Sequence, residues 1–172
     1  MREISLAILD VAQNSIDAGA TLVEITVTID ENLIGFAVAD NGKGMSEVEL
    51  SNAVERGVSF KGGSGLGLAL LKEETCEAGG KLKISSEAGA GATVKAEYKA
   101  KSAVIGKLGD TFATLVDEGY DTVLNLSVLG KRYSYDTREL KSSAGVARLQ
   151  SSGALRLIRE DINKKTNGGA ML

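Results

Sequence analysis

Residues 8–21 read ILDVAQNSIDAGAT, and this stretch joins an amphipathic helix to the strand that follows it. Apolar side chains recur at spacings of three and four over residues 3–19, which predicts a helix that ends near Gly19. Asp10 and Asn14 are four positions apart, so they share one helical face with Cβ atoms about 6 Å apart. Such a pair can be a solvated polar stripe, or it can supply an acid and a neutral oxygen beside a phosphate group.

Alternating apolar residues predict two pairs of strands, with a glycine-rich loop and a helix between them. The expected strands are 21–29, 33–40, 81–86 and 91–100. A short helix is expected near residues 46–56 and a longer one over residues 66–78. This order predicts an α+β sandwich in which helices cover one face of a mixed sheet.

A shift in composition near residues 100–106 predicts a boundary. We divide the chain into a first domain, residues 1–102, and a C-terminal α/β extension, residues 103–172. The extension is expected to form a helix, a hairpin and a weaker helix, over residues 108–118, 122–128 with 132–136, and 146–163. The tail from Lys164 is expected to fray.

The composition excludes several kinds of chemistry. The 172 residues include no histidine and one cysteine, so imidazole-dependent nucleophiles are excluded, and Cys76 alone makes neither a zinc site nor an internal disulfide. Lys and Arg number 20 against 23 Asp and Glu, and this net charge of −3 gives no strong nucleic-acid signal. Because no apolar run reaches membrane length, we expect a cytoplasmic protein that does not contact a membrane.

The second predicted strand ends on a carboxylate that is followed by a glycine loop. Asp40 falls on the same side of the strand as Phe36 and Val38, where burial is costly unless a donor is supplied. Gly42 and Gly44 follow at once, and glycine lets a ligand approach the backbone closely. The carboxylate can simply start an Asp-Asn-Gly turn, or it can accept a hydrogen bond from the exocyclic amine of a purine.

A second glycine loop opens the helix over residues 66–78. The run Gly63-Ser64-Gly65-Leu66-Gly67 leaves free backbone N–H groups at the helix start, where the helix dipole favours an anion. The run is not a P-loop, because no Gly-Lys-Ser/Thr follows, and its spacing is not that of the dinucleotide fingerprint. Lys61 and Lys72 flank it and can either meet phosphate charge or remain solvated.

The three motifs together resemble the three boxes of the GHKL ATPases, the group of gyrase, heat-shock chaperones, histidine kinases and the mismatch-repair protein MutL. Residues 8–21 resemble the N box, and the run NSIDAGAT within them is similar to the mismatch-repair branch. Residues 40–45 resemble the G1 box and residues 63–68 the G2 box. The resemblance covers residues 3–100. It implies the two-layer α/β sandwich of that group, with ATP and Mg²⁺ as ligands.

The resemblance also implies a role for each motif residue. Asn14 would coordinate Mg²⁺ bridging the ATP phosphates, and Asp40 would bind the adenine amine. Asp10 would be the catalytic base, at a position where the hydrolysing and serine-phosphorylating members carry the longer glutamate. Residues 46–62 would form a short lid. The other nucleotide contacts would come from Gly42, Gly44, Met45, Lys61, Gly63, Ser64, Gly65, Leu66, Gly67 and Thr93.

The sequence departs from the group near the last of the four strands. The group usually follows a glycine there with Thr or Ser, whereas Ala92 follows Gly91 in this chain. Thr93 is adjacent, but strand alternation sends it to the opposite face together with Lys95. The missing hydroxyl is expected to weaken nucleotide binding by about 1 kcal/mol.

Four functions are compatible with these motifs. The first is an Mg-ATP-binding protein that acts as a slow ATPase or a nucleotide switch, since the length and the extension resemble small stand-alone histidine-kinase-like ATP-binding proteins of anaerobic bacteria. The others are a serine kinase of the anti-sigma-factor type, a histidine-kinase-like domain that acts on a separate protein, and a site that no longer holds ATP. We expect residues 103–172 to bind a protein partner, and a homodimer is also compatible.

Overall fold

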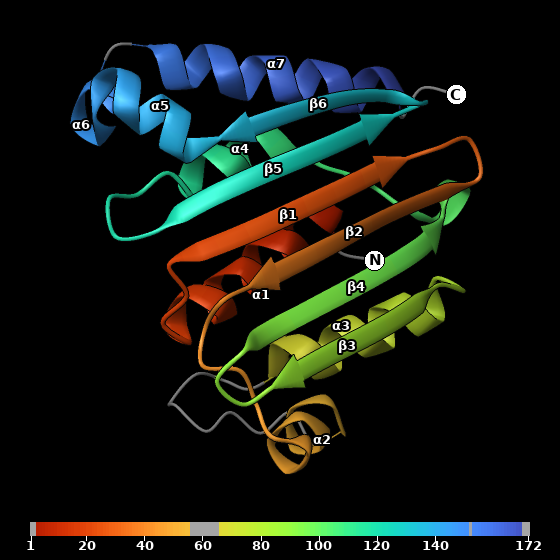
Figure 1. Cartoon of the computed structure of the whole chain (residues 1–172). Coiled ribbons are helices and arrows are strands. Elements are labelled where there is room, and N and C mark those ends of the chain that lie inside the picture. The colour runs from red at the N-terminus through yellow and green to blue at the C-terminus, as the bar shows by residue number, and fades with distance from the viewer. Residues whose placement is uncertain (1–2, 56–65, 152, 170–172) are drawn as a thin grey trace.

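The computed structural model describes residues 3–55, 66–151 and 153–169. Six strands form one mixed sheet in the order β3-β4-β2-β1-β5-β6 (Figure 1). The strands are β1 (Leu22–Ile29), β2 (Leu33–Asp40), β3 (Lys81–Glu87), β4 (Gly91–Lys99), β5 (Asp121–Val128) and β6 (Lys131–Asp136). The helices are α1 (Ile4–Asp17), α2 (Glu47–Glu55), α3 (Leu66–Glu77), α4 (Leu108–Thr114), α5 (Thr137–Ala144), α6 (Val146–Ser151) and α7 (Ala154–Gly169), with a short 3₁₀ turn η1 (Ala100–Ser102).

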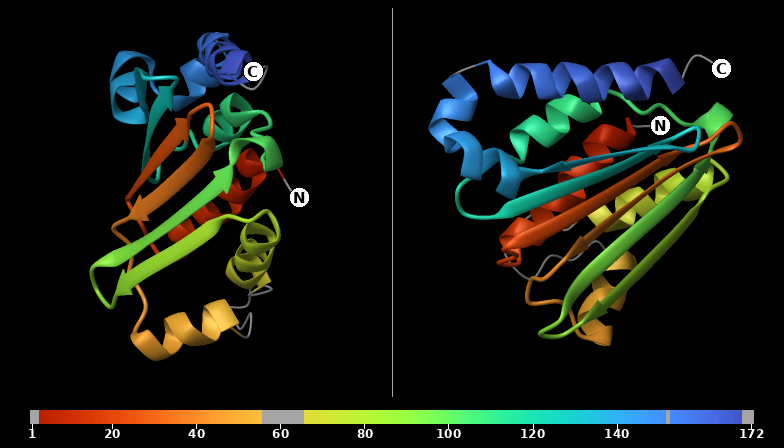
Figure 2. Two further views of the ribbon diagram at one scale, coloured as in Figure 1. Left: turned by 90° about the vertical axis from the view of Figure 1, so that its right-hand side faces the viewer. Right: turned by 45° about the horizontal axis from the view of Figure 1, so that its top comes forward.

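Helices α1, α3, α4 and α7 gather on one side of the sheet, whose other side is open along β1, β2 and β4 (Figure 2). Alternation in β1 is complete, because Val23, Ile25, Val27 and Ile29 are buried while the residues between them are exposed. The apolar face of β2 and β4 continues this layer and packs against α1 and α3. The predicted fold, an α+β sandwich with helices on one face of a mixed sheet, is confirmed.

The short helix α2 begins where the sequence places a capping box. Ser46 precedes the helix, and its amide and hydroxyl both donate to the carboxylate of Glu49, at 2.8 and 2.9 Å. The Glu49 amide donates back to Ser46 Oγ at 3.4 Å, so the two residues satisfy each other's groups at the helix start. These hydrogen bonds from Ser46 hold the pKa of Glu49 below its usual value.

The chain beyond residue 102 joins the same sheet. Strand β5 pairs in parallel with β1 along its whole length, from Leu22 opposite Asp121 to Ile29 opposite Val128, and β6 returns beside β5 as the predicted hairpin. Helix α4 packs near α1, where the Thr111 hydroxyl donates to the backbone oxygen of Ser5 at 3.0 Å. Leu124 and Leu126 of β5 therefore belong to the one core that β1 builds.

The prediction of a helical pattern over residues 146–163 is confirmed, but the pattern forms two helices in place of one, and the predicted fraying from Lys164 is wrong. The chain forms two helices, α6 and α7, with Gly153 between them at a φ of 74°. Helix α7 continues to Gly169, because residues in its last turns are held. Lys165 Nζ donates to the hydroxyl of Tyr135 at 2.9 Å, and the buried Thr166 hydroxyl donates to the Ile162 oxygen at 3.0 Å.

Candidate functional site

The carboxylate of Asp40 is fixed by two donors at the end of β2. Ser15 Oγ, from α1, donates to Asp40 Oδ2 at 2.7 Å. The Gly42 amide, from the loop after β2, donates to Asp40 Oδ1 at 2.8 Å. Asp40 is half-buried, and each of its two oxygens accepts one of these hydrogen bonds. The structure thus brings residues of the first and second motifs together around one carboxylate.

Asn41 ties the same loop to the turn between α1 and β1. Its side-chain oxygen accepts from the amides of Thr21 and Leu22 at 2.9 and 3.0 Å, and its Nδ2 donates to Thr21 Oγ1 at 2.9 Å. All three hydrogen bonds are made by the side chain of Asn41, a residue that the sequence indicated only as part of a turn. Asn41 therefore fixes the loop that carries Asp40.

Two glycines let this loop approach the β3–β4 turn. Gly44 has a φ of +64°, and a Cβ there would lie 1.9 Å from the Glu87 backbone oxygen. Gly91 has a φ of +92°, and its Cβ would lie 2.0 Å from the Asp40 backbone oxygen. Ser86 bridges the two segments, because its hydroxyl accepts from the Met45 amide at 2.8 Å and donates to the Gly91 oxygen at 2.9 Å.

Asn14 and Asp10 are both exposed on α1. Asn14 faces the first turn of α3, where a Cβ on Gly67 would lie 3.7 Å from Asn14 Nδ2. The N–H groups that begin α3 therefore lie beside an amide side chain, an arrangement suited to an anion. Asn14 is also the residue whose oxygen can contribute to an Mg²⁺ site, together with phosphate oxygens and water.

Several predicted site residues lie away from Asp40 or outside the described residues. Lys61, Gly63, Ser64 and Gly65 lie outside the described residues, and of Leu66 only the backbone is described, as the first residue of α3. Thr93 pairs with Ala39 and Ser85 on the open face of the sheet, away from Asp40, as strand alternation predicted. Lys72 lines a groove between α2, α3 and β3 that Asp40 and Asn14 do not line.

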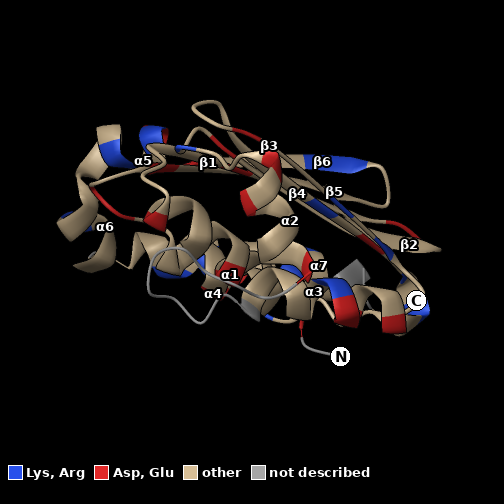
Figure 3. Cartoon of the chain, turned by 90° about the horizontal axis from the view of Figure 1, so that it is seen from below, with Lys and Arg blue, Asp and Glu red and all other residues tan. Residues whose placement is uncertain are grey.

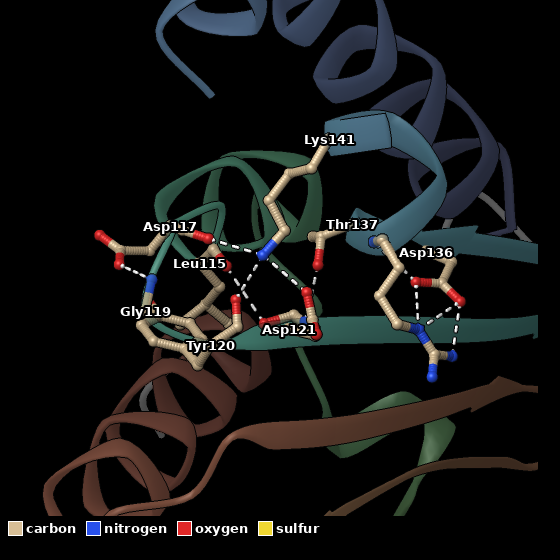
Figure 4. Close-up of polar contacts among 10 residues, drawn as sticks. Leu115, Asp117, Gly119, Tyr120, Asp121, Asp136, Thr137 and Lys141 are labelled. Carbon is tan, nitrogen blue, oxygen red and sulfur yellow. Dashed lines mark hydrogen bonds and ion pairs between the residues drawn. The ribbon is translucent and has the colours of Figure 1, made fainter. Parts of the chain in front are cut away.

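The C-terminal segment supports the strand end beside this site. Lys141 Nζ of α5 donates to the backbone oxygens of Asp117 and Tyr120 at 2.9 and 2.8 Å, and forms an ion pair of 2.6 Å with Asp121 (Figure 4). The Asp121 amide donates to the Thr21 oxygen at 2.9 Å. Thr21 also forms hydrogen bonds with Asn41. Helix α5 is therefore connected to the loop of Asp40 by the chain of contacts from Lys141 through Asp121 and Thr21 to Asn41.

Ser15, Asn41 and Ser86 were missed as site residues by the sequence analysis. Ser15 carried a signal, because it lies on the apolar side of α1 and is only 4% exposed, so its hydroxyl needs a partner. The sequence gives no comparable signal for Asn41 and Ser86, since each forms its hydrogen bonds with a segment that is distant in the sequence. Within the described residues, no group of three or more Asp, Glu or Cys side chains is arranged to hold a metal ion.

The chain is similar in sequence to a known protein family and in fold to a solved structure. Residues 2–102 match the family described as histidine kinase-, DNA gyrase B- and HSP90-like ATPase. The chain is 44% identical over 55 residues to the DNA mismatch repair protein MutL of Rhodospirillum rubrum, covering 32% of this chain and 9% of the relative. It is 35% identical over 83 residues to the sensor histidine kinase YcbM of Bacillus subtilis, covering 43% of this chain and 27% of the relative.

A crystal structure of the N-terminal domain of a DNA repair protein has the same fold, with a TM-score of 0.59 at 14% identity, over 87% of this chain and 59% of that one. The chain spans only 9% and 27% of the two sequence relatives. No helix in the described part of the chain is long and apolar enough to cross a membrane. The family match covers more than half of the chain and includes Asn14, Asp40 and Gly67, so the protein belongs to the histidine kinase-, DNA gyrase B- and HSP90-like ATPases.

Proposed function

We propose that this protein binds Mg·ATP in the cytoplasm and acts as a slow ATPase or as a nucleotide-dependent switch. Membership of the family supports ATP binding in general. The observation that carries the proposal is the Asp40 carboxylate, which Ser15 and Gly42 fix from two sides. A carboxylate accepts hydrogen bonds, and adenine presents an amine to such a group at the position where guanine presents an oxygen.

The phosphates would lie between α1 and the start of α3. Asn14 stands against the first turn of α3, whose N–H groups favour an anion. Mg²⁺ fits this position, because Asn14 offers a neutral oxygen and the ion commonly takes its other ligands from phosphate and water. When bound, the ion would neutralise phosphate charge and so favour phosphoryl transfer.

Asp10 is the candidate base. It is exposed on α1, one helical turn before Asn14, so its carboxylate is on the face that would meet the phosphates. There it would orient an attacking water or hydroxyl and accept its proton. Aspartate reaches one methylene less far than glutamate, and this shorter reach supports a slow reaction.

The site also supports transfer of the phosphoryl group to a protein. A serine on a partner, as in anti-sigma-factor kinases, or a histidine on a separate protein would serve as acceptor, since the chain itself contains no histidine. A protein partner would contact residues 103–172, where Leu157 of α7 is 62% exposed, and the same surface would serve a homodimer. The remaining alternative is a site that no longer binds ATP, because Ala92 stands where the family usually has Thr or Ser.

A thermal-shift titration with Mg·ATP tests the proposal. A ligand that binds only the folded chain adds about 2.7 kcal/mol to the free energy of unfolding at one hundred times its Kd. We expect a concentration-dependent rise in Tm for the unchanged protein and a much smaller rise for Asp40→Asn. The absence of a shift for the unchanged protein at millimolar nucleotide would overturn ATP binding.

Radiolabelled ATP then separates the activities. Free phosphate without an added protein indicates an ATPase, and label on a partner indicates a kinase. Asp10→Ala should abolish either reaction while leaving the thermal shift in place. Gln13→Ala is the matched control, because Gln13 is exposed on the same helix and bonds only its neighbour Asp17, at 3.0 Å, among the hydrogen bonds described. Equal rates for the two variants would exclude Asp10 as the base.

A further inference from the structure

Strand β3 forms one edge of the sheet. It is the first strand in the order β3-β4-β2-β1-β5-β6, and only β4 pairs with it among the described strands. The other edge, β6, has α7 running along it, and Lys165 of α7 contacts the rings of Tyr133 and Tyr135 (Figure 1). An edge strand presents unpaired N–H and C=O groups that can accept another strand.

On the helix side of β3 lies an apolar groove with a volume of about 350 Å³. Leu82 and Ile84 project into it from the strand, and Leu50 and Val54 from α2 form its other wall. Its rim is polar. The rim residues are Glu47, Ser51, Glu55 and Lys72. The groove therefore offers contact to apolar side chains that extend from a strand laid along β3.

The open face of the same strand carries Lys81 and Lys83 at one end and Glu87 at the other, and Lys81 stands opposite Glu97 of β4. Lys81 and Lys83 are exposed there, and Lys83 stands directly opposite Lys95 of β4, a like-charge pair that costs stability. Lys95 has an ion pair with Glu97 at 3.2 Å, whereas neither Lys81 nor Lys83 has one with a described residue. Figure 3 marks the charged residues along the ribbon, with α1, α3 and α4 on the other side of the sheet from this face.

We propose that the open edge of β3 binds an extended segment of a partner protein in which acidic and apolar side chains alternate. Alternate side chains of an added strand point to opposite faces. One set would then meet Lys81 and Lys83 and relieve the repulsion at Lys95, and the other set would enter the groove of Leu82 and Ile84. This inference concerns a surface separate from Asp40 and does not depend on nucleotide binding.

Charge complementarity selects this occupant over two others. A second copy of the chain paired through β3 would bring two more lysines and only one carboxylate, Glu87, to this face, so the lysines would be neutralised only in part. A nucleic acid would satisfy the lysines but would leave the apolar groove unfilled. Of the three occupants, only a peptide with acidic residues on one face and apolar residues on the other both fills the groove and neutralises the lysines.

Peptide binding to the full chain tests the proposal. The probe is a fluorescent peptide of about eight residues that alternates Glu and Val, followed by anisotropy at low and high salt. We expect binding that weakens with salt, and at least tenfold weaker binding of a peptide with the same residues in two blocks. Equal binding of the two peptides would overturn the proposal, because only alternation separates the two faces of a strand.

Charge reversal locates the contact. Lys81→Glu with Lys83→Glu should weaken the binding of the alternating peptide at least tenfold. The matched control reverses Lys131 and Arg132, which are exposed basic residues on the other edge strand, and should change the Kd less than twofold. An equal loss from both pairs would mean that general charge attraction binds the peptide, and the proposal would fail.

Discussion

The hydroxyl of Ser15 donates a 2.7 Å hydrogen bond to Asp40 Oδ2 and so joins helix α1 to the end of β2. The two residues are 25 positions apart in the sequence. Their contact unites the segment that carries Asn14 with the loop that carries Gly42 and Gly44. The orientation of the candidate adenine-binding carboxylate therefore depends on a side chain of the helix that would face the phosphates.

Replacing Ser15 by alanine should weaken nucleotide binding. Asp40 would lose one of its two donors and rotate more freely, and the free energy of unfolding should fall by about 1 kcal/mol. We expect the Kd for Mg·ATP, taken from a thermal-shift titration, to rise several-fold. Ser5→Ala is the matched control, because Ser5 is a buried serine of the same helix that is remote from Asp40. Equal nucleotide affinity in the two variants would contradict this role of Ser15.

Replacing Gly44 by alanine should separate the loop after β2 from the β3–β4 turn. Its φ of +64° is unfavourable for alanine, and the new Cβ would lie 1.9 Å from the Glu87 oxygen. We expect a loss of about 3 kcal/mol or more in the free energy of unfolding, measured with urea. Gly89→Ala isolates the backbone cost, because Gly89 has a φ of +83° and no atom within 4 Å of the new Cβ.

Gly89→Ala should then cost about 1–2 kcal/mol, the usual penalty of the left-handed conformation. The difference between the two variants measures the contact between the loop and the turn. Equal losses would show that this contact is absent in solution.

Local patterns predicted the first part of the fold well. The alternation in β1 and β2 placed Val23 and Phe36 inside correctly, because strand periodicity depends only on neighbouring residues. The position of Thr93 on the open face followed from the same rule. The order of the three motifs indicated the family, which the comparison confirmed.

Contacts between distant segments could not be predicted in this way. The alternation of β5 does not indicate that this strand pairs in parallel with β1, because a strand of similar composition could pair with any other strand of the sheet. The brace from Asn41 to Thr21 depends on the meeting of two loops. The break at Gly153 was missed because a glycine inside a weak helical pattern is compatible with either continuity or a stop.

Removal of residues 103–172 should unfold the rest of the protein. The sequence predicts a boundary near residue 102, but β1 would lose its partner β5, and the core would lose Phe112 and Leu124. We expect the shortened chain to show no cooperative urea transition by circular dichroism. Leu157→Ser, at an exposed position of α7, serves as the control and should stay within about 0.5 kcal/mol of the unchanged protein. A shortened chain that unfolds cooperatively and retains its thermal shift with ATP would establish residues 1–102 as an independent domain.

The cap of α5 should make stability depend on pH in the acid range. Asp136 accepts from the Arg138 amide at 2.8 Å and forms an ion pair with its guanidinium at 2.6 Å. The side-chain hydrogen bond from Arg138 holds the pKa of Asp136 below its usual value. A carboxyl group with a lowered pKa in the folded state stabilises the protein above its unfolded pKa of about 3.9, and this contribution is lost as pH falls through the folded pKa.

Asp136→Asn keeps a good helix cap but removes the charge, so it isolates this effect. Urea unfolding at pH 7, 5 and 3 should show the unchanged protein more stable than the variant at neutral pH, with the difference shrinking below about pH 4. In an Arg138→Met background the same substitution should show a weaker pH dependence, because the guanidinium is the first cause of the lowered pKa. A difference that stays constant from pH 7 to pH 3 would mean that the carboxylate contributes to α5 as a neutral cap and not through its charge.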